Sequence, residues 1–158
     1  LGPPVSGRAT REGKLGQVPG PWLTPAKSGY ILQPMQHSPG FLAVVDKART
    51  RVNEVDLAQA RERLANNPDA ILMDVREDTE WAAGHAAGAI HLGKGILERD
   101  IESAMPDKAA EVIMYCGGGF RSVLTAEVAQ RMGYTNVHSL IGGHKALVNA
   151  GWDMENGE

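Results

Sequence analysis

A cysteine followed by three glycines is the feature of the sequence best suited to covalent chemistry. Residues 116–122 read Cys-Gly-Gly-Gly-Phe-Arg-Ser, and Cys116 is the only cysteine in the chain. A single cysteine forms no internal disulfide, builds no thiolate zinc site and has no second thiol to resolve an oxidised form. Cys116 therefore acts alone or with a partner molecule, and the residues after it decide its reactivity.

The glycines indicate a backbone that turns its amide groups toward an anion. An ordered glycine costs about 0.5–1 kcal/mol more than alanine, so a run of three at a junction needs a compensating role. Glycine supplies the freedom for successive N–H groups to form an anion-binding nest. A helix that begins near Arg121 adds its positive end, and the Arg121 guanidinium adds a full charge. We expect this environment to favour the Cys116 thiolate at neutral pH, which makes it a nucleophile.

Two other uses of this run stay open on the residues alone. A lone cysteine is often an inert buried apolar side chain, and a glycine-rich turn without one would be a phosphate loop. A dinucleotide-binding turn needs Gly-x-Gly-x-x-Gly with an acid about 20 residues later, and the run only roughly imitates it. A Walker A loop needs Lys-Ser or Lys-Thr after its last glycine, whereas Phe120 follows Gly119. Neither alternative accounts for the whole run.

Composition excludes several classes of protein. The chain has 158 residues, of which 42% are hydrophobic and 22% charged, with a net charge of -3, typical of one globular domain with a core. It has no apolar run long enough to span a membrane. The charge balance and few aromatic residues give no reason to expect a nucleic-acid partner. The histidines have no metal-ligand spacing, so we expect neither a metal nor another cofactor.

The composition changes near residue 40. Residues 1–40 hold seven of the nine prolines and carry about +3 in charge, with no hydrophobic period. We expect residues 1–40 to be a flexible tail rich in proline and glycine, and residues 41–158 to be the folded domain. A basic docking arm is the alternative use of the tail. The tail has no apolar segment typical of a secretory signal, which together with the free thiol favours a cytoplasmic location.

Short apolar runs alternate with helical periods along the domain. Asp56 and Gln59 predict a capping box at the start of one helix. Strands are expected at residues 52–55, 70–73, 89–92, 111–115 and 137–140. Helices are expected at residues 57–66, 77–83, 96–105, 121–132 and 143–151. This alternation predicts an α/β fold with a mostly parallel sheet and helices on both faces, whose site lies beyond the carboxyl ends of the strands.

Three motifs, in this order, resemble the rhodanese-like family. Residues 74–92 contain Asp-Val-Arg-Glu, Glu-Trp, Gly-His and Gly-Ala-Ile-His-Leu, which resemble the first family signature. Residues 115–122 resemble the active-site loop, and residues 142–152 resemble the closing motif, with Leu147 in place of a frequent aromatic residue. The resemblance covers roughly residues 50–155. It implies a rhodanese-like, open parallel five-stranded sheet with helices on both faces.

The resemblance implies a sulfurtransferase that works through a persulfide on Cys116. The thiolate takes sulfane sulfur from a donor such as thiosulfate, and the persulfide passes it to cyanide, a small thiol or a protein. A second hypothesis is a sulfur-relay module that serves a partner protein and turns over small acceptors slowly. A third is a phosphatase or an arsenate-reducing enzyme. Related phosphatases have five residues between cysteine and arginine, whereas four residues separate Cys116 from Arg121.

The candidate site residues fall into a loop and a supporting group. Cys116 is the expected nucleophile, and the rest of the loop is expected to bind the substrate: Gly117, Gly118, Gly119, Phe120, Arg121 and Ser122. Four polar residues are expected to support the loop, a structural role being favoured over direct contact with a donor: Asp74, Arg76, Glu80 and His85. The expected partners are a small sulfur donor and a small or protein acceptor, with no nucleic acid, no membrane and a monomeric chain.

Overall fold

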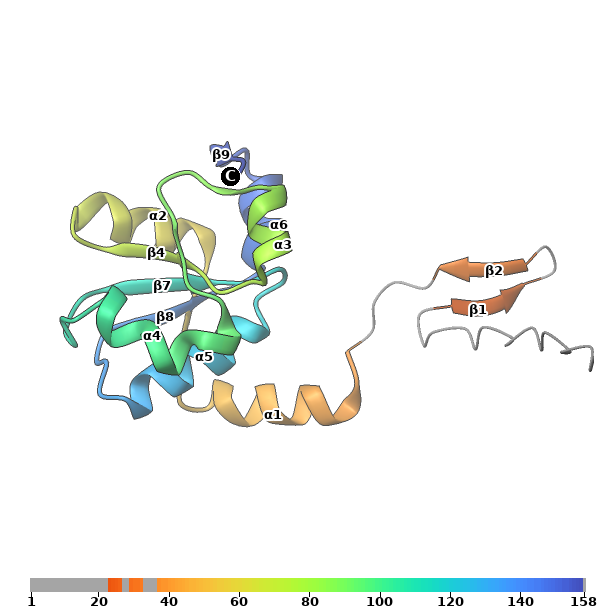
Figure 1. Cartoon of the computed structure of the whole chain (residues 1–158), viewed down its shortest axis with the longest axis horizontal. Coiled ribbons are helices and arrows are strands. Elements are labelled where there is room, and N and C mark those ends of the chain that lie inside the picture. Colours follow the sequence, from red (N-terminus) through yellow and green to blue (C-terminus); the bar gives the residue numbers. More distant parts are fainter. Residues whose placement is uncertain (1–22, 27–28, 33–36, 158) are drawn as a thin grey trace, which may run out of the picture. The chain divides into compact units, whose positions relative to one another are not determined.

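The computed structural model describes residues 23–26, 29–32 and 37–157 (Figure 1). The chain divides into two units at the boundary between His37 and Ser38, and each is described by itself. In the first unit, strands β1 (Leu23–Ala26) and β2 (Gly29–Leu32) form an antiparallel pair. The sequence analysis expects no strands here, because no alternating apolar pattern marks them. The flexibility expected for residues 1–40 falls mostly on residues outside the described ranges.

Five parallel strands form the centre of the second unit, in the order β3-β8-β7-β4-β6. The strands, in chain order, are β3 (Asn53–Val55), β4 (Ile71–Asp74), β6 (Ile90–His91), β7 (Val112–Tyr115) and β8 (Val137–Leu140). Parallel neighbours need crossover connections, and the helices between the strands supply them. The predicted five-stranded parallel sheet is confirmed.

Helices cover both faces of this sheet (Figure 1). One face carries α1 (Pro39–Arg49), α4 (Leu97–Ala104) and α5 (Arg121–Arg131), which share one apolar core. The other carries α2 (Leu57–Asn66) and α6 (Gly143–Asn149). The shorter elements are α3 (Asp78–Ala83), the 3-10 turn η1 (Lys94–Ile96), and strands β5 (His85–Ala86) and β9 (Met154–Glu155), which pair antiparallel. Within the described ranges, no helix is long and apolar enough to cross a membrane.

Alternate residues of β7 enter the two cores. Val112 and Met114 belong to the core under α1, α4 and α5, whereas Ile113 and Tyr115 belong to the core under α2 and α6. All four side chains are fully buried. A strand covered on both faces needs apolar residues at every position, which explains the unbroken apolar run in the sequence. Cys116 follows Tyr115 directly, so this rigid central strand sets its position.

Helix α1 is the α-helix of the described ranges that the sequence analysis does not predict. The Ser38 hydroxyl accepts a hydrogen bond from the Phe41 amide at 3.3 Å, and Pro39 occupies the first turn. Val45 and Ala48 bury one face of the helix in the core that also contains α5. Pro39 and Gly40 resemble turn residues in the sequence, but proline suits the first turn of a helix because its missing N–H has no partner there. The helix therefore begins before the composition change expected near residue 40.

The other α-helices and the five strands of the parallel sheet lie close to their expected positions, whereas the short strands β5 and β9 were not expected. The capping box of α2 is confirmed, since Asp56 Oδ1 accepts from the Gln59 amide at 2.8 Å and Gln59 Oε1 accepts from the Asp56 amide at 2.9 Å. The expected strand at residues 89–92 is shorter, at Ile90–His91, and the expected helix at residues 96–105 is α4 preceded by η1. Such differences are usual at the ends of elements, where few hydrogen bonds hold the backbone.

The buried central strand gives a stability prediction. Ile113→Ala removes a fully buried side chain between β7 and the helices α2 and α6, and leaves a cavity. We expect the free energy of unfolding to fall by about 2–5 kcal/mol, measured by urea denaturation. Val148→Ala, at an exposed apolar position of α6, is the control and is expected to change it by less than about 0.5 kcal/mol. Equal effects of the two substitutions would contradict this assignment of the core.

Candidate active site

The candidate site lies where parallel strands end side by side. Cys116 follows β7, and Asp74 is the last residue of β4, in register with Tyr115. The Val75 amide donates to the Tyr115 carbonyl at 3.0 Å, so the two strand ends leave the sheet together. The two segments expected to form a site, residues 74–76 and 116–121, are therefore neighbours at the carboxyl end of the sheet.

The Cys116 sulfur is buried among hydrogen-bond donors. Cys116 is only 1% exposed to solvent. The Gly119 amide donates to Sγ at 3.2 Å, and the Ser122 hydroxyl lies 3.5 Å from Sγ. The Ser122 hydroxyl also lies 2.8 Å from the Ser139 hydroxyl on β8. Helix α5 begins at Arg121 and adds its positive end. These groups can stabilise an anionic sulfur, as the nest hypothesis requires.

Helix α6 holds the backbone of the loop in place. The His144 amide donates to the Cys116 carbonyl at 2.7 Å, and the Lys145 amide donates to the Gly117 carbonyl at 3.1 Å. In a trans peptide the C=O and N–H groups point in opposite directions. The amides of Gly117 and Gly118 are therefore directed away from α6. The first turn of α6 thus fixes which way the loop amides face, a role that the sequence analysis does not assign to it.

Close approach between the loop and the turn before α6 explains the glycines. Gly119 has φ +94°, and a Cβ there would lie 2.9 Å from the Gly142 nitrogen. Gly143 has φ +53°, and a Cβ there would overlap the Cys116 carbonyl oxygen. Both positions require glycine for conformation and for space. Gly118 is different, since the nearest atom to a Cβ there is Phe120 Cδ2 at 3.9 Å. The sequence analysis interprets residues 142–152 as a closing motif and a helix, and assigns them no contact with the loop.

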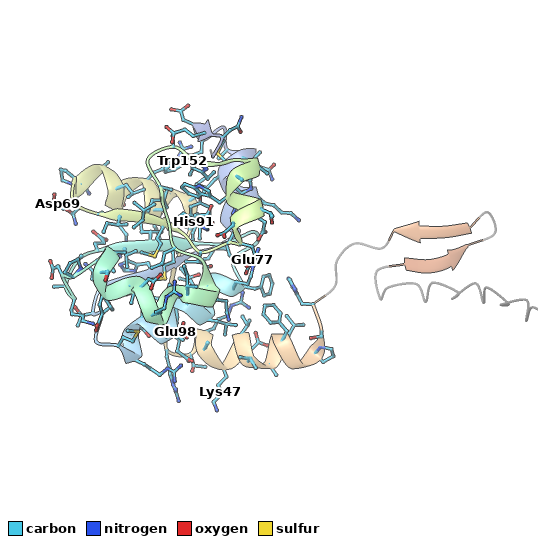
Figure 2. The ribbon with its side chains drawn as sticks, viewed as in Figure 1. Lys47, Asp69, Glu77, His91, Glu98 and Trp152 are labelled. Atoms are coloured by element: carbon cyan, nitrogen blue, oxygen red, sulfur yellow. The ribbon has the colours of Figure 1, made fainter. Side chains whose placement is uncertain are left out.

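Arg121 forms a two-fold ion pair with Glu80. Arg121 Nη1 and Nη2 donate to Glu80 Oε2 and Oε1 at 2.7 and 2.8 Å. Glu80 Oε2 also accepts from the Glu77 amide at 3.1 Å, at the N-terminal end of α3, where Figure 2 labels Glu77. The hydrogen bond from Arg121 lowers the pKa of Glu80 to about 2, and the bonded carboxylate raises the pKa of Arg121. The pair fastens α3 to the loop and occupies the arginine that was expected to bind a donor.

Asp74 and Arg76 form a second, buried ion pair. Arg76 Nη2 lies 2.7 Å from Asp74 Oδ2 and also donates to the Gly84 carbonyl at 2.7 Å. The Arg76 amide donates to Asp74 Oδ1 at 2.9 Å. Both residues are almost completely buried, and each charge has hydrogen-bonding partners, as a buried ion pair requires. The contacts join the end of β4 to the segment after α3, in line with the favoured structural role.

The histidines near the site make packing contacts. The His85 ring stacks on Trp81, with centroids 3.3 Å apart, and its Nδ1 lies 3.1 Å from the Trp81 carbonyl oxygen. His91 stacks on the same tryptophan, with centroids 4.8 Å apart. Burial, assisted by the charge of Arg76, lowers the pKa of His144, so its ring is neutral at neutral pH. No cluster of three or more metal-ligating side chains occurs within the described residues.

Phe120 links the loop to α1. Its ring centroid lies 6.3 Å from that of Phe41, and the Arg49 guanidinium carbon lies 5.0 Å from the Phe120 centroid. Arg49 also pairs with Glu54 at 3.2 Å. The sequence analysis identifies Phe120 but neither of its α1 neighbours, because it does not predict the helix that carries them.

The Rhodanese-like domain family matches residues 56–150, and the chain belongs to this family. A sulfurtransferase from Allochromatium vinosum is 32% identical over 92 residues, which cover 58% of this chain and 84% of that one. The thiosulfate sulfurtransferase GlpE from Coxiella burnetii is 35% identical over 80 residues, which cover 51% of this chain and 73% of that one. A Rhodopseudomonas palustris structure described as a "Possible Tyrosine Phosphatase" has a TM-score of 0.67 at 27% identity. The match covers 78% of this chain and 99% of that one. The family resemblance of the three motifs is confirmed.

The tight contact at Gly119 gives a prediction. Gly119→Ala forces a side chain into a left-handed conformation against the turn at residues 140–142, so the loop must shift. We expect the free energy of unfolding to fall by about 1–3 kcal/mol in urea denaturation. In the matched control Gly118→Ala, which meets no atom closer than 3.9 Å, it is expected to change by less than about 1 kcal/mol. A larger loss for Gly118→Ala would refute this account of the loop.

The Glu80–Arg121 pair gives a pH prediction. The pKa of Glu80 is lowered from 4.5 to about 2, so its stabilising contribution is complete above pH 4.5 and is lost as the pH falls through about 2. Glu80→Gln removes the titrating carboxylate. Thermal unfolding from pH 7 to pH 2 is therefore expected to show a smaller acid destabilisation in Glu80→Gln than in the wild type. Parallel curves for the two proteins would show that the ion pair adds no stability.

Proposed function

We propose that the chain is a sulfurtransferase of the thiosulfate type, which carries sulfane sulfur as a persulfide on Cys116. The observation that carries the proposal is the convergence of the Gly119 amide and the Ser122 hydroxyl on Cys116 Sγ, at 3.2 and 3.5 Å. A persulfide needs a nucleophilic sulfur and donors that stabilise its negative charge, and the loop supplies both. Membership of the rhodanese-like family and the relative named thiosulfate sulfurtransferase support the same chemistry.

In the first half-reaction, the Cys116 thiolate attacks the outer sulfur of thiosulfate. A bond forms between Sγ and that sulfur, the S–S bond of thiosulfate breaks, and sulfite leaves with the electron pair. The negative charge moves from Sγ to the outer sulfur of the new persulfide. The Gly117 and Gly118 amides, directed away from α6, are the backbone donors that we assign to the donor anion and to this charge.

In the second half-reaction, an acceptor attacks the outer sulfur. Cyanide, or the thiolate of a small molecule or protein, forms a bond to that sulfur, and the Cys116 thiolate leaves. The two steps use one site in turn, so ping-pong kinetics are expected. An S–S bond is about 2.05 Å long, so the outer sulfur extends beyond a cysteine that is itself 1% exposed. This extension would give an acceptor access to sulfur that the free enzyme buries.

A sulfur-relay module is the alternative that shares this chemistry. In a relay, the acceptor is a partner protein, and turnover with cyanide or small thiols is slow. Steady-state rates with small acceptors, compared with the rate at which a loaded persulfide passes sulfur to a candidate protein thiol, distinguish the two. Phosphate-ester hydrolysis is disfavoured, because four residues between Cys116 and Arg121 leave a shorter loop than the phosphatases have.

The proposal is tested by mass spectrometry of the intact protein. After incubation with thiosulfate, the wild type is expected to gain about 32 Da, the mass of one sulfur atom, and cyanide is expected to remove it as thiocyanate. Cys116→Ser, which keeps the size of the side chain, should gain nothing. An adduct on Cys116→Ser, or a wild type that alkylates readily but takes sulfur from no donor, would overturn the proposal.

A further inference from the structure

Glu80 cancels the one positive charge that the loop itself carries. Arg121 is the only basic residue in the run 116–122, and both of its terminal nitrogens bond to Glu80. The pair lies against the residue next to the nucleophile, because a Cβ at Gly117 would be 3.1 Å from Arg121 Nη2 and 3.9 Å from Glu80 Oε1. An anion bound by the Gly117 amide therefore meets a carboxylate as well as a guanidinium.

The surroundings add acidic rather than basic groups on this side. The start of α3 carries Glu77 and Asp78 beside Glu80. Of the nearby cations, Arg76 is buried and paired with Asp74, and Arg49, which lies over the Phe120 ring, is paired with Glu54. Lys145 contacts the loop through its backbone amide, and the residue is exposed to solvent. The backbone amides remain as binding groups, and they attract an anion through dipoles without supplying a net charge.

We propose that Glu80 determines donor preference: it disfavours a doubly charged donor such as thiosulfate relative to a hydropersulfide, RS–SH, which carries one negative charge at most. The inference rests on the proposed function, since it concerns the loading of the same Cys116 persulfide. Glu80 acts on the incoming donor through its charge, because its carboxylate lies beside the loop residue that follows the nucleophile.

The electrostatic reason is the dependence of charge repulsion on donor charge. A carboxylate repels a dianion twice as strongly as a monoanion at the same place, and a neutral molecule hardly at all. With Arg121 neutralised, the loop itself compensates the donor with amide dipoles, which supply only partial charges. One unit of charge a few ångströms away at a water-facing site is worth about fivefold in binding or rate. We therefore expect a difference of that size between the donors to depend on Glu80.

The loading step with a hydropersulfide is balanced without another reagent. The Cys116 thiolate attacks the terminal sulfur of RS–SH, and a bond forms between Sγ and that sulfur. The S–S bond of the donor breaks, and the thiolate RS⁻ leaves with the electron pair. The proton stays on the transferred sulfur as Cys116–S–SH and is then lost to water, which leaves the same enzyme persulfide that thiosulfate forms.

The test compares two donors in three proteins. Persulfide formation on Cys116 is followed by rapid-quench mass spectrometry with thiosulfate and with 2-hydroxyethyl hydropersulfide, and the second-order rate constants are expressed as a ratio. In Glu80→Gln, which keeps an oxygen that can accept from Arg121, we expect the ratio of thiosulfate to hydropersulfide to rise about fivefold at low salt. The rise is expected to shrink in high salt, because ions screen a surface charge.

Asp78→Asn is the matched control. It removes one negative charge from the same turn of α3, but its carboxylate is 97% exposed, and the two oxygens bonded to Arg121 belong to Glu80. We expect the donor ratio to change by less than twofold. A Glu80→Gln variant that loses rate equally with both donors, or an Asp78→Asn variant that shifts the ratio as much, would overturn the proposal.

A second measurement needs no variant. In the wild type, loading by thiosulfate is expected to depend weakly on ionic strength, because the loop presents a neutral pair to the donor. A steep fall with salt would show an unpaired cation at the mouth and would overturn the inference even if Glu80→Gln fails to fold. A wild type that loads from neither donor would instead overturn the proposed function, so the two failures are distinguishable.

Discussion

The structure of the site depends on two hydrogen bonds between the first turn of α6 and the loop after β7. The amides of His144 and Lys145 hold the carbonyls of Cys116 and Gly117. They set the direction of the peptide planes, and so the direction in which the following amides point. The contact exists only because Gly143 brings its backbone against the Cys116 carbonyl. Cys116, at the end of the central strand, thereby gains a loop whose amide donors are already oriented, which is the condition for the electrostatic stabilisation that the proposed function requires.

Two ion pairs connect the end of β4 and helix α3 to the rest of the site. Arg76 connects Asp74, at the end of β4, to the carbonyl of Gly84, and Glu80 connects α3 to Arg121 at the start of α5. The first pair is buried and joins the segments that leave the sheet. The second is partly exposed and lies beside the loop, where its charges also act on whatever binds there. One arginine therefore serves packing, whereas the other, with its carboxylate, is the pair that we propose sets the charge met by a donor.

The sheet and most helices could be predicted because their sequences follow the simple rules of burial. Strand β7 is apolar at each position since both of its faces are covered, and α2 begins at a complete capping box. Helix α1 could not be predicted, because it begins with Pro39 and Gly40, which suit a turn equally well. Because α1 was not predicted, Phe41 and Arg49, its residues next to Phe120, were not identified as neighbours of the loop. Local pattern does not distinguish a turn from a first helical turn when packing against α5 decides the outcome.

The sequence alone determined the family, the parallel sheet and the candidate reactive segment, because cysteine, glycines and helix start are contiguous and their chemistry is local. It also named Glu80 and Arg121 as site residues. Only the tertiary structure showed that these two pair with each other, across 41 positions of the chain, rather than meeting a substrate separately. It likewise decided which glycines are indispensable, since a side chain at Gly119 would meet Gly142 and one at Gly143 would meet the Cys116 carbonyl. Contacts between distant segments arise from the packing of whole elements, and no local pattern in the chain records them.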